Sequence, residues 1–140
     1  MKVIQLIGGV VILFILFSCT KEKEVNYADN LDGSIDMRYN VQRRVSDNLL
    51  LEIIELIDTR CPVGSVCNEA GNVQIGFRVF SDEGITTTTV YYNDFQSASH
   101  TLDTIKGHTL EVVKVTPYPF KDELLKAPQS YTVTVIVTQL

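Results

Sequence analysis

Side chains that could perform metal or acid–base chemistry are few in this 140-residue chain. It has only two histidines, His100 and His108, which lie on either side of Asp103. A turn in this segment, which contains Lys106-Gly107, could bring both histidines together with Asp103. Such a group could bind a metal, because imidazole and carboxylate groups are common ligands of zinc and copper. Exposed loop histidines are far more common than such a site, so we expect no metal and no cofactor.

The carboxylate pairs also give little support to catalysis. Asp82-Glu83 and Asp122-Glu123 are adjacent in sequence and fall in expected turns, which is typical of solvated surfaces rather than of acid–base pairs. The chain has neither a glycine-rich phosphate loop nor a serine-centred nucleophile elbow. We therefore predict that the protein is not an enzyme and has no catalytic residues.

A third candidate for chemistry is the thiol of Cys19. An apolar run from Val3 to Phe17 follows the basic residue Lys2, and small Ser18 precedes the cysteine. The segment Leu16-Phe17-Ser18-Cys19 resembles the lipobox of bacterial lipoproteins, whose cysteine is alkylated by diacylglycerol after the signal peptide is cut. The resemblance implies a signal peptide over residues 1–18 and an acylated Cys19 that anchors the protein in the bacterial cell envelope, with the outer membrane as the expected location.

A membrane-spanning helix is the alternative for the same apolar run. Val3 to Phe17 covers 15 residues, whereas a bilayer core requires roughly 20 apolar residues and secretory h-regions contain about 7–15. The length therefore favours the lipoprotein signal peptide.

The processed chain is large enough for one ordinary domain. Removing residues 1–18 leaves 122 residues and takes the formal net charge from −5 to −6, because Lys2 is lost. An acidic domain repels nucleic acids and anionic lipid headgroups, so neither is an expected partner. Residues 19–33 are polar and mixed in charge, and we expect a flexible tether that is followed by the folded domain over residues 34–140.

The two remaining cysteines, Cys61 and Cys67, form an even pair outside the reducing cytosol. This compartment predicts a disulfide bond between them. Closing so short a loop stabilises the fold by roughly 2–3 kcal/mol on the chain-entropy model. The five-residue gap differs from the C-x-x-C spacing of redox centres, so we expect a structural role.

Strand patterns separated by turn residues begin at about Ile35. Asn72–Phe80 and Tyr131–Thr138 are the clearest, because every second residue is apolar. The turn Ser81–Gly84 predicts that Asn72–Phe80 forms a hairpin with Ile85–Tyr92. The threonines at 86–89 are typical of an exposed strand.

The other runs are less regular. We interpret Leu49–Ile57 as a central or bulged strand, with an amphipathic helix as the alternative. Ile35–Val45 predicts one earlier strand, and His108–Thr116 predicts a later one that ends at Pro117. Asp122–Ala127 could form one helical turn. Six or seven short strands indicate an all-β fold, an antiparallel β-sandwich of immunoglobulin-like size, with a small β-barrel as the alternative.

A motif of the form D-x-R-C-P-x4-C-x2-A-G runs from Asp58 to Gly71, between two expected strands. It resembles a motif of small lipoproteins of the Bacteroidetes, a family without an established activity. The similarity continues more loosely through His108–Val112 and Val115–Pro119 to the closing strand at Tyr131. Members of that family commonly carry a tryptophan where this chain has Glu69.

The motif makes physical sense as architecture, because Pro62 and Gly64 bend a loop whose width the cysteines fix. A loop of this kind is also where many β-domains place a binding surface. The polar groups available for binding would be Asp58, Arg60, Asn68 and Glu69.

Two classes of function fit these features. The first is a non-catalytic envelope module, binding or structural, that presents the disulfide-stapled loop to a protein or glycan partner. The second is an inhibitor or accessory domain that acts on an envelope or extracellular enzyme through the same loop.

Overall fold

Alternating apolar residues account for the long strands. In the strand β4 (Val73–Ser81), Val73, Ile75, Phe77 and Val79 are all fully buried. In β8 (Thr132–Gln139), Val133 and Val135 are buried in the same way. Because successive side chains of a strand point to opposite faces, this period of two gives each strand one apolar face. The alternation expected in both segments is confirmed, although Val137 of β8 is only partly buried.

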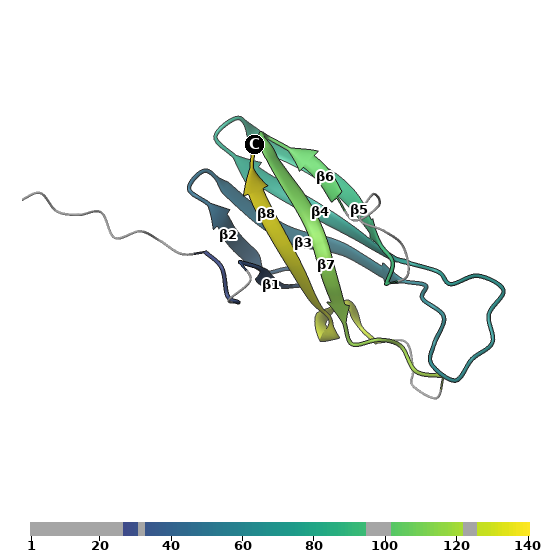
Figure 1. Cartoon of the computed structure of the whole chain (residues 1–140). Coiled ribbons are helices and arrows are strands. Elements are labelled where there is room, and N and C mark those ends of the chain that lie inside the picture. The colour runs from purple at the N-terminus through teal and green to yellow at the C-terminus, as the bar shows by residue number, and fades with distance from the viewer. Residues whose placement is uncertain (1–26, 31–32, 95–101, 122–125) are drawn as a thin grey trace, which may run out of the picture.

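These faces pack together in a β-sandwich, shown by a computed structural model that describes residues 27–30, 33–94, 102–121 and 126–140 (Figure 1). Sheet I has the strand order β1-β8-β7-β6 and sheet II the order β2-β3-β4-β5, and all neighbouring strands are antiparallel. The other six strands are β1 (Ile35–Arg38), β2 (Gln42–Ser46), β3 (Leu49–Asp58), β5 (Gly84–Tyr92), β6 (Leu102–Ile105) and β7 (His108–Thr116). The predicted all-β sandwich is therefore confirmed, as two separate sheets rather than a closed barrel.

The strand β3 lies in the middle of sheet II and carries a bulge. Its register with β4 shifts between Ile53 and Glu55. The carbonyl oxygen of Ile54 accepts a hydrogen bond of 3.1 Å from the Tyr39 hydroxyl. Opposite the bulge lies Gly76, where an added Cβ would come within 2.9 Å of the Glu55 Cβ. The prediction of a central, bulged strand is confirmed, and the helical alternative is wrong.

The single strand expected over residues 35–45 is wrong, because the structure has two strands in different sheets. The chain leaves sheet I after Arg38 and turns at Asn40, which has a φ of 57°. Asparagine tolerates this left-handed conformation better than most residues. The Asn40 N–H donates to the Ile53 carbonyl at 2.9 Å, which directs the chain into sheet II.

The other boundaries follow the turn signals. The β4–β5 hairpin is confirmed, and β7 ends at Thr116, directly before Pro117. The expectation missed β6, which pairs with β7 through a turn at Lys106-Gly107. The predicted helical turn falls mainly on residues 122–125, which lie outside the described residues, and a 3-10 turn follows at Pro128–Ser130.

The last part of the expected tether lies against the domain. Tyr27 packs on the core, and its hydroxyl donates to Asp47 at 3.0 Å in the β2–β3 turn. Asp29 pairs with Arg43 of β2 and accepts a hydrogen bond from the Asp36 N–H. Cys19 and the apolar run before it lie outside the described residues, among which no helix is long and apolar enough to cross a membrane.

Candidate functional site

The D-x-R-C-P motif forms the loop between β3 and β4, which projects beyond one end of the sandwich (Figure 1). The loop is supported by the segment that follows β7. The Val63 N–H donates to the Pro119 carbonyl at 2.9 Å, and the Lys121 N–H donates to the Val63 carbonyl at 3.1 Å. The tip of the loop therefore consists of two chain segments that pair with one another.

The predicted disulfide between Cys61 and Cys67 is present and closes the tip, with the two Cα atoms 5.9 Å apart. Within it, the Ser65 N–H donates to the Pro62 carbonyl at 3.0 Å. Gly64 occupies the third position of this turn with a φ of 86°, a conformation that favours glycine. The disulfide and the turn together define the shape of the tip.

The C-terminal end of the motif, at Gly71, is also fixed by close contacts. Gly71 has a φ of 70°, and a Cβ placed there would lie 1.9 Å from the carbonyl oxygen of Thr59. The Gly71 carbonyl accepts a hydrogen bond of 3.0 Å from the Asn93 side chain, and the Ala70 carbonyl accepts one of 2.9 Å from the Cys61 N–H. Only glycine fits this position without displacing the opposite side of the loop.

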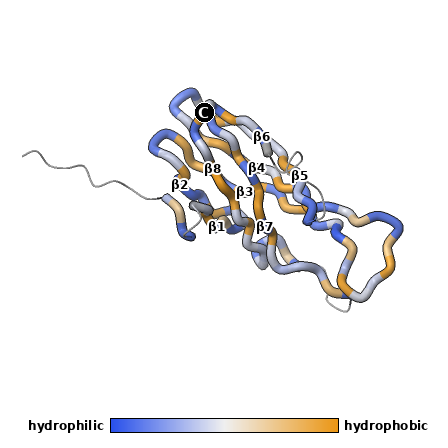
Figure 2. Tube along the Cα trace, in the orientation of Figure 1, coloured by the Kyte–Doolittle hydropathy of each residue, from blue (hydrophilic) through white to orange (hydrophobic). Residues whose placement is uncertain are grey.

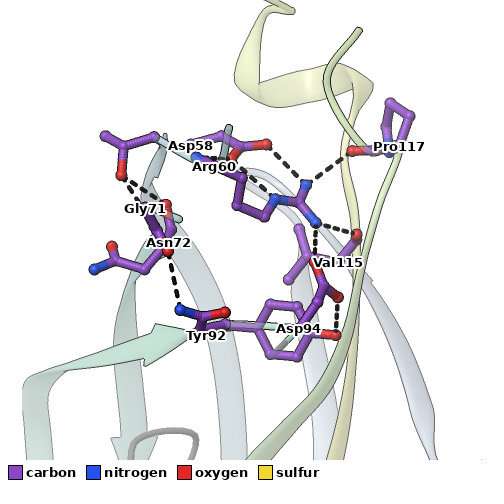
Figure 3. A network of polar contacts seen from close by, with 10 residues as sticks. Asp58, Arg60, Gly71, Asn72, Tyr92, Asp94, Val115 and Pro117 are labelled. Atoms are coloured by element: carbon purple, nitrogen blue, oxygen red, sulfur yellow. Dashed lines mark hydrogen bonds and ion pairs between the residues drawn. The ribbon is translucent and has the colours of Figure 1, made fainter. Parts of the chain in front are cut away.

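The base of the loop is fixed by Arg60, whose exposed fraction is only 4% (Figure 3). All five of its side-chain N–H groups have acceptors. The acceptors are both carboxylate oxygens of Asp58 at 3.0 and 2.8 Å, Asp94 at 3.1 Å, the Val115 carbonyl at 3.1 Å and the Pro117 carbonyl at 3.0 Å.

Aromatic residues complete the surroundings of this guanidinium group. Arg60 lies over the ring of Tyr118, 4.5 Å from the ring centroid, which adds a cation–π contact. The Tyr92 hydroxyl donates to Asp94 at 2.6 Å, and the Tyr131 hydroxyl lies near the Asp58 carboxylate. We call Asp58, Arg60, Tyr92, Asp94, Tyr118 and Tyr131 the arginine network.

The arginine network keeps Arg60 charged. Burial alone opposes the charged form, but hydrogen bonds and charge attraction from Asp58 and Asp94 outweigh it, so the pKa of Arg60 is raised above its already high value. Burial also raises the pKa of Tyr92 and of Tyr131 to about 12, and the nearby carboxylates Asp94 and Asp58 add to the effect. Both tyrosines therefore stay neutral, and the Tyr92 O–H group donates a hydrogen bond to Asp94.

The arginine network connects the two sheets. Asp58 ends β3 and Asp94 follows β5, and both of these strands belong to sheet II. Val115 lies in β7 and Tyr131 directly precedes β8, and these strands belong to sheet I. Arg60 is thus a clasp between the sheets at the end that carries the loop, with no N–H group left for an external ligand.

Comparison of the chain with protein-family models, with curated proteins and with solved structures finds no match. The site is therefore interpreted from its own chemistry. Asp58 and Arg60, expected to be available for binding, are turned into the interior, with side chains only 5% and 2% exposed. Asn68 and Glu69 are exposed on the loop.

The apolar character of the tip was not predicted from the sequence. Three large hydrophobic side chains are exposed there, Val63, Val66 and Phe120, and Val66 is fully exposed. Figure 2 shows hydrophobic stretches in this loop, away from the sheets. We call these three residues the apolar tip. A valine at both ends of the predicted bend was the available signal, whereas the position of Phe120 depends on long-range pairing with Val63.

Of the three residues considered as metal ligands, the structure describes His108 and Asp103. His108 is buried as the first residue of β7, with its Nδ1 3.0 Å from the Lys106 carbonyl, so it is not an exposed loop histidine. Asp103 accepts a hydrogen bond from Thr88, and His100 lies outside the described residues. Among the residues that are described, no three His, Cys, Asp or Glu side chains are grouped as metal ligands would be. Glu83, one of the paired carboxylates, contacts the Lys106 ammonium at 2.7 Å.

The first prediction concerns the clasp. Replacing Arg60 with Met should lower the free energy of unfolding by about 3–5 kcal/mol, because it leaves the Asp58 carboxylate buried without its counter-charge. Arg60→Lys should also destabilise the domain, since one ammonium group cannot reach five acceptors. Urea unfolding measures both effects. The control is Arg43→Met, which breaks a partly exposed ion pair with Asp29 and should cost less than about 1 kcal/mol. Equal losses for Arg60→Met and Arg43→Met would contradict the role of the clasp.

The second prediction concerns alkaline pH. The pKa values of Tyr92 and Tyr131 are about 12 in the folded state and near 10 in the unfolded state, so the unfolded state releases these protons first. Stability should therefore be constant with respect to these groups below pH 10 and fall as the pH rises toward 12. In the double variant Tyr92→Phe/Tyr131→Phe the fall should be shallower, as measured by urea unfolding at each pH. Tyr91→Phe, at an exposed position, is the control, and an unchanged slope in the double variant would refute the assignment.

Proposed function

We propose that the protein is a non-catalytic binding module of the bacterial cell envelope, anchored through a lipid on Cys19, which presents its stapled loop to a protein partner. The observation that carries this proposal is the apolar tip, Val63, Val66 and Phe120, exposed on a loop that is held rigid. Burying apolar side chains against a partner is favourable by roughly 25 cal/mol for each Å² of apolar surface removed from water.

Rigidity makes the loop suitable for recognition. The disulfide between Cys61 and Cys67, the pairing of Val63 with Phe120 and the buried Arg60 fix the tip before any partner arrives. A pre-organised surface loses little conformational entropy on binding, so more of the contact energy remains as affinity.

The chemistry of the tip favours a protein over a glycan. The exposed valines and phenylalanine offer apolar area, which matches an apolar pocket on a folded protein. Asn68 and Glu69 lie on the same loop as exposed polar groups, where they suit the polar rim of such an interface. The resemblance to small lipoproteins of the Bacteroidetes supports the location and is silent on the partner.

The position of the tether suits this display. Tyr27 contacts Asp47 in the turn before β3, whereas the loop follows the opposite end of β3. Eight residue steps separate Cys19 from Tyr27, which is a reach of roughly 26–29 Å for an extended chain. The lipid would therefore attach near one end of the sandwich while the loop projects from the other.

The third prediction tests the apolar tip. The double variant Val63→Asp/Val66→Asp should bind its envelope partner about tenfold more weakly or worse, because the new charges would have to be desolvated in an apolar contact. The measurement is pull-down from envelope extract followed by titration of the captured protein. Val41→Asp is the matched control, since Val41 is 51% exposed and Val63 52% exposed, but Val41 lies between β1 and β2. Equal capture by all three proteins would remove the loop from the proposal.

The identity of the captured protein distinguishes the two candidate functions. An inhibitor or accessory domain should retain a hydrolase whose activity changes on binding, whereas an assembly module should retain a membrane complex. The Cys61–Cys67 loop projects from the sandwich and is closed by a disulfide, which is compatible with insertion into an enzyme cleft. This observation supports the inhibitor as the second candidate.

The fourth prediction tests the anchor. Cys19→Ser should release the protein from the membrane fraction, because a serine cannot form the thioether that carries the diacylglycerol. Each buried methylene of an acyl chain contributes about 0.8 kcal/mol, so two or three chains hold the protein firmly. Fractionation by ultracentrifugation is the measurement, with Ser65→Ala as a control substitution that leaves the anchor unchanged. Tight membrane association of Cys19→Ser would contradict lipid anchoring.

A further inference from the structure

The four edge strands of the sandwich differ in how well they are protected. An exposed edge offers unpaired N–H and C=O groups to another strand, and proteins usually protect it by short length, charge, proline or bulges. β1 and β6 are only four residues long. β2 has five residues, a register shift and the charges of Arg43 and Arg44. Three of the four edges therefore carry at least one such protection.

The fourth edge, β5, carries none of them. It is nine residues long and pairs with β4 in one continuous register without a bulge. Its sequence, Gly-Ile-Thr-Thr-Thr-Thr-Val-Tyr-Tyr, contains no charged residue and no proline. β5 is the last strand of sheet II among the described residues (Figure 1). Because an antiparallel strand bonds each neighbour through alternate residues, half of its backbone groups face this open edge.

The outer face of β5 also carries two exposed hydrophobic side chains. Ile85 is 68% exposed and Tyr91 is 45% exposed, and they lie near opposite ends of the strand. Between them on the same face are Thr87 and Thr89, which are exposed as well. The face therefore has an apolar group toward each end and two hydroxyl groups in the middle.

We propose that β5 is a self-association edge, through which two copies of this chain pair antiparallel about a two-fold axis at Thr88. Thr88 is the middle residue of the strand, so the axis places all nine residues opposite residues of the second copy. Thr87 then faces Thr89 of the second copy, and Ile85 faces Tyr91 of the second copy, each pair occurring twice. The two sheets II join into one continuous sheet of eight strands.

The composition of β5 favours a second copy over a strand from another protein. Threonine pairs and aromatic–β-branched pairs are among the cross-strand pairs that stabilise antiparallel sheets. The two-fold arrangement generates both kinds from one strand. β5 itself holds no charged residue, so no like charges of the two strands face each other, and no opposite charge of a foreign strand is called for. One carboxylate contacts the strand at the axis residue, because Asp103 of β6 accepts a hydrogen bond from Thr88 within each copy.

The fifth prediction uses the two-fold geometry. In Thr87→Lys/Thr89→Lys every new lysine faces a lysine of the second copy, so the dimer should dissociate at least about tenfold more readily. In Thr87→Lys/Thr89→Glu each lysine faces a glutamate, so the dimer should persist. Thr104→Lys, at an exposed position of the short edge β6, is the surface control. Light scattering on the full chain in detergent micelles, corrected for bound detergent, gives the protein mass over a concentration series.

The expected result is a two-chain mass for the natural chain, Thr87→Lys/Thr89→Glu and Thr104→Lys, and a one-chain mass for Thr87→Lys/Thr89→Lys, which circular dichroism should show to be folded. Hydrogen exchange of those β5 amides that face the open edge, and not β4, should be slow in the dimers and fast in the monomer. A one-chain mass for the natural chain at every concentration would overturn the proposal, and slow exchange in that monomer would assign the edge to another segment of the same chain. A dimer that survives in Thr87→Lys/Thr89→Lys would place the interface elsewhere and overturn it too. Slow exchange only after adding envelope extract would assign the edge to another protein, against the second copy.

Discussion

The burial of one charged group, the Arg60 guanidinium, constrains the whole loop end of the molecule. Removing a cation from water is costly, and the cost is offset only when every N–H group finds an acceptor and the charge is balanced. Here the acceptors come from Asp58, Asp94 and two carbonyl groups at the end of β7. Both sheets must therefore be in place before the arginine is fully bonded, so the clasp couples the packing of the sheets to the position of the loop.

Some residues of the motif around Arg60 hold the loop in place, and others are exposed on its surface. Asp58, Arg60 and Gly71 face inward or allow a close approach, and they set the base of the loop. The disulfide of Cys61 sets the tip beyond it. Because Asp58 and Arg60 are used in the interior, the side chains that remain exposed on the loop are the apolar Val63 and Val66 and the polar Asn68 and Glu69. Most of the motif is therefore explained by architecture, and the side chains available to the proposed partner lie between its fixed residues.

The sequence was sufficient for features that depend on local periodicity. The alternation in β4 and β8 predicted their buried faces, and the even pair of cysteines predicted the disulfide. Asp58 and Arg60 lie two residues apart, which places them on the same side of an extended chain, but their spacing does not show that this side is buried. Asp94 lies 34 residues from Arg60, and the two meet only because β4 and β5 return the chain to the same end. The four-residue strand β6 was missed because so short a segment has almost no period to detect.

In the proposed pair, the two-fold arrangement about the β5 edge determines where the tether and the loop of each copy lie. In a two-fold pair through β5 the strands run in opposite directions, so the two loops project from opposite ends of the joined sheet, and so do the two Tyr27 residues. A nine-residue strand is about 30 Å long, which is close to the roughly 26–29 Å that each tether can span. If each copy carries the proposed lipid, both lipids would reach the same bilayer only with the strands lying along its surface, and the loops of such a pair would then point sideways across the membrane. A single copy anchored in the proposed way would have no such restriction and could stand with its loop far from the bilayer. The proposed self-association and the proposed display of the loop would therefore be coupled by geometry, because pairing would determine the height of the apolar tip above the membrane.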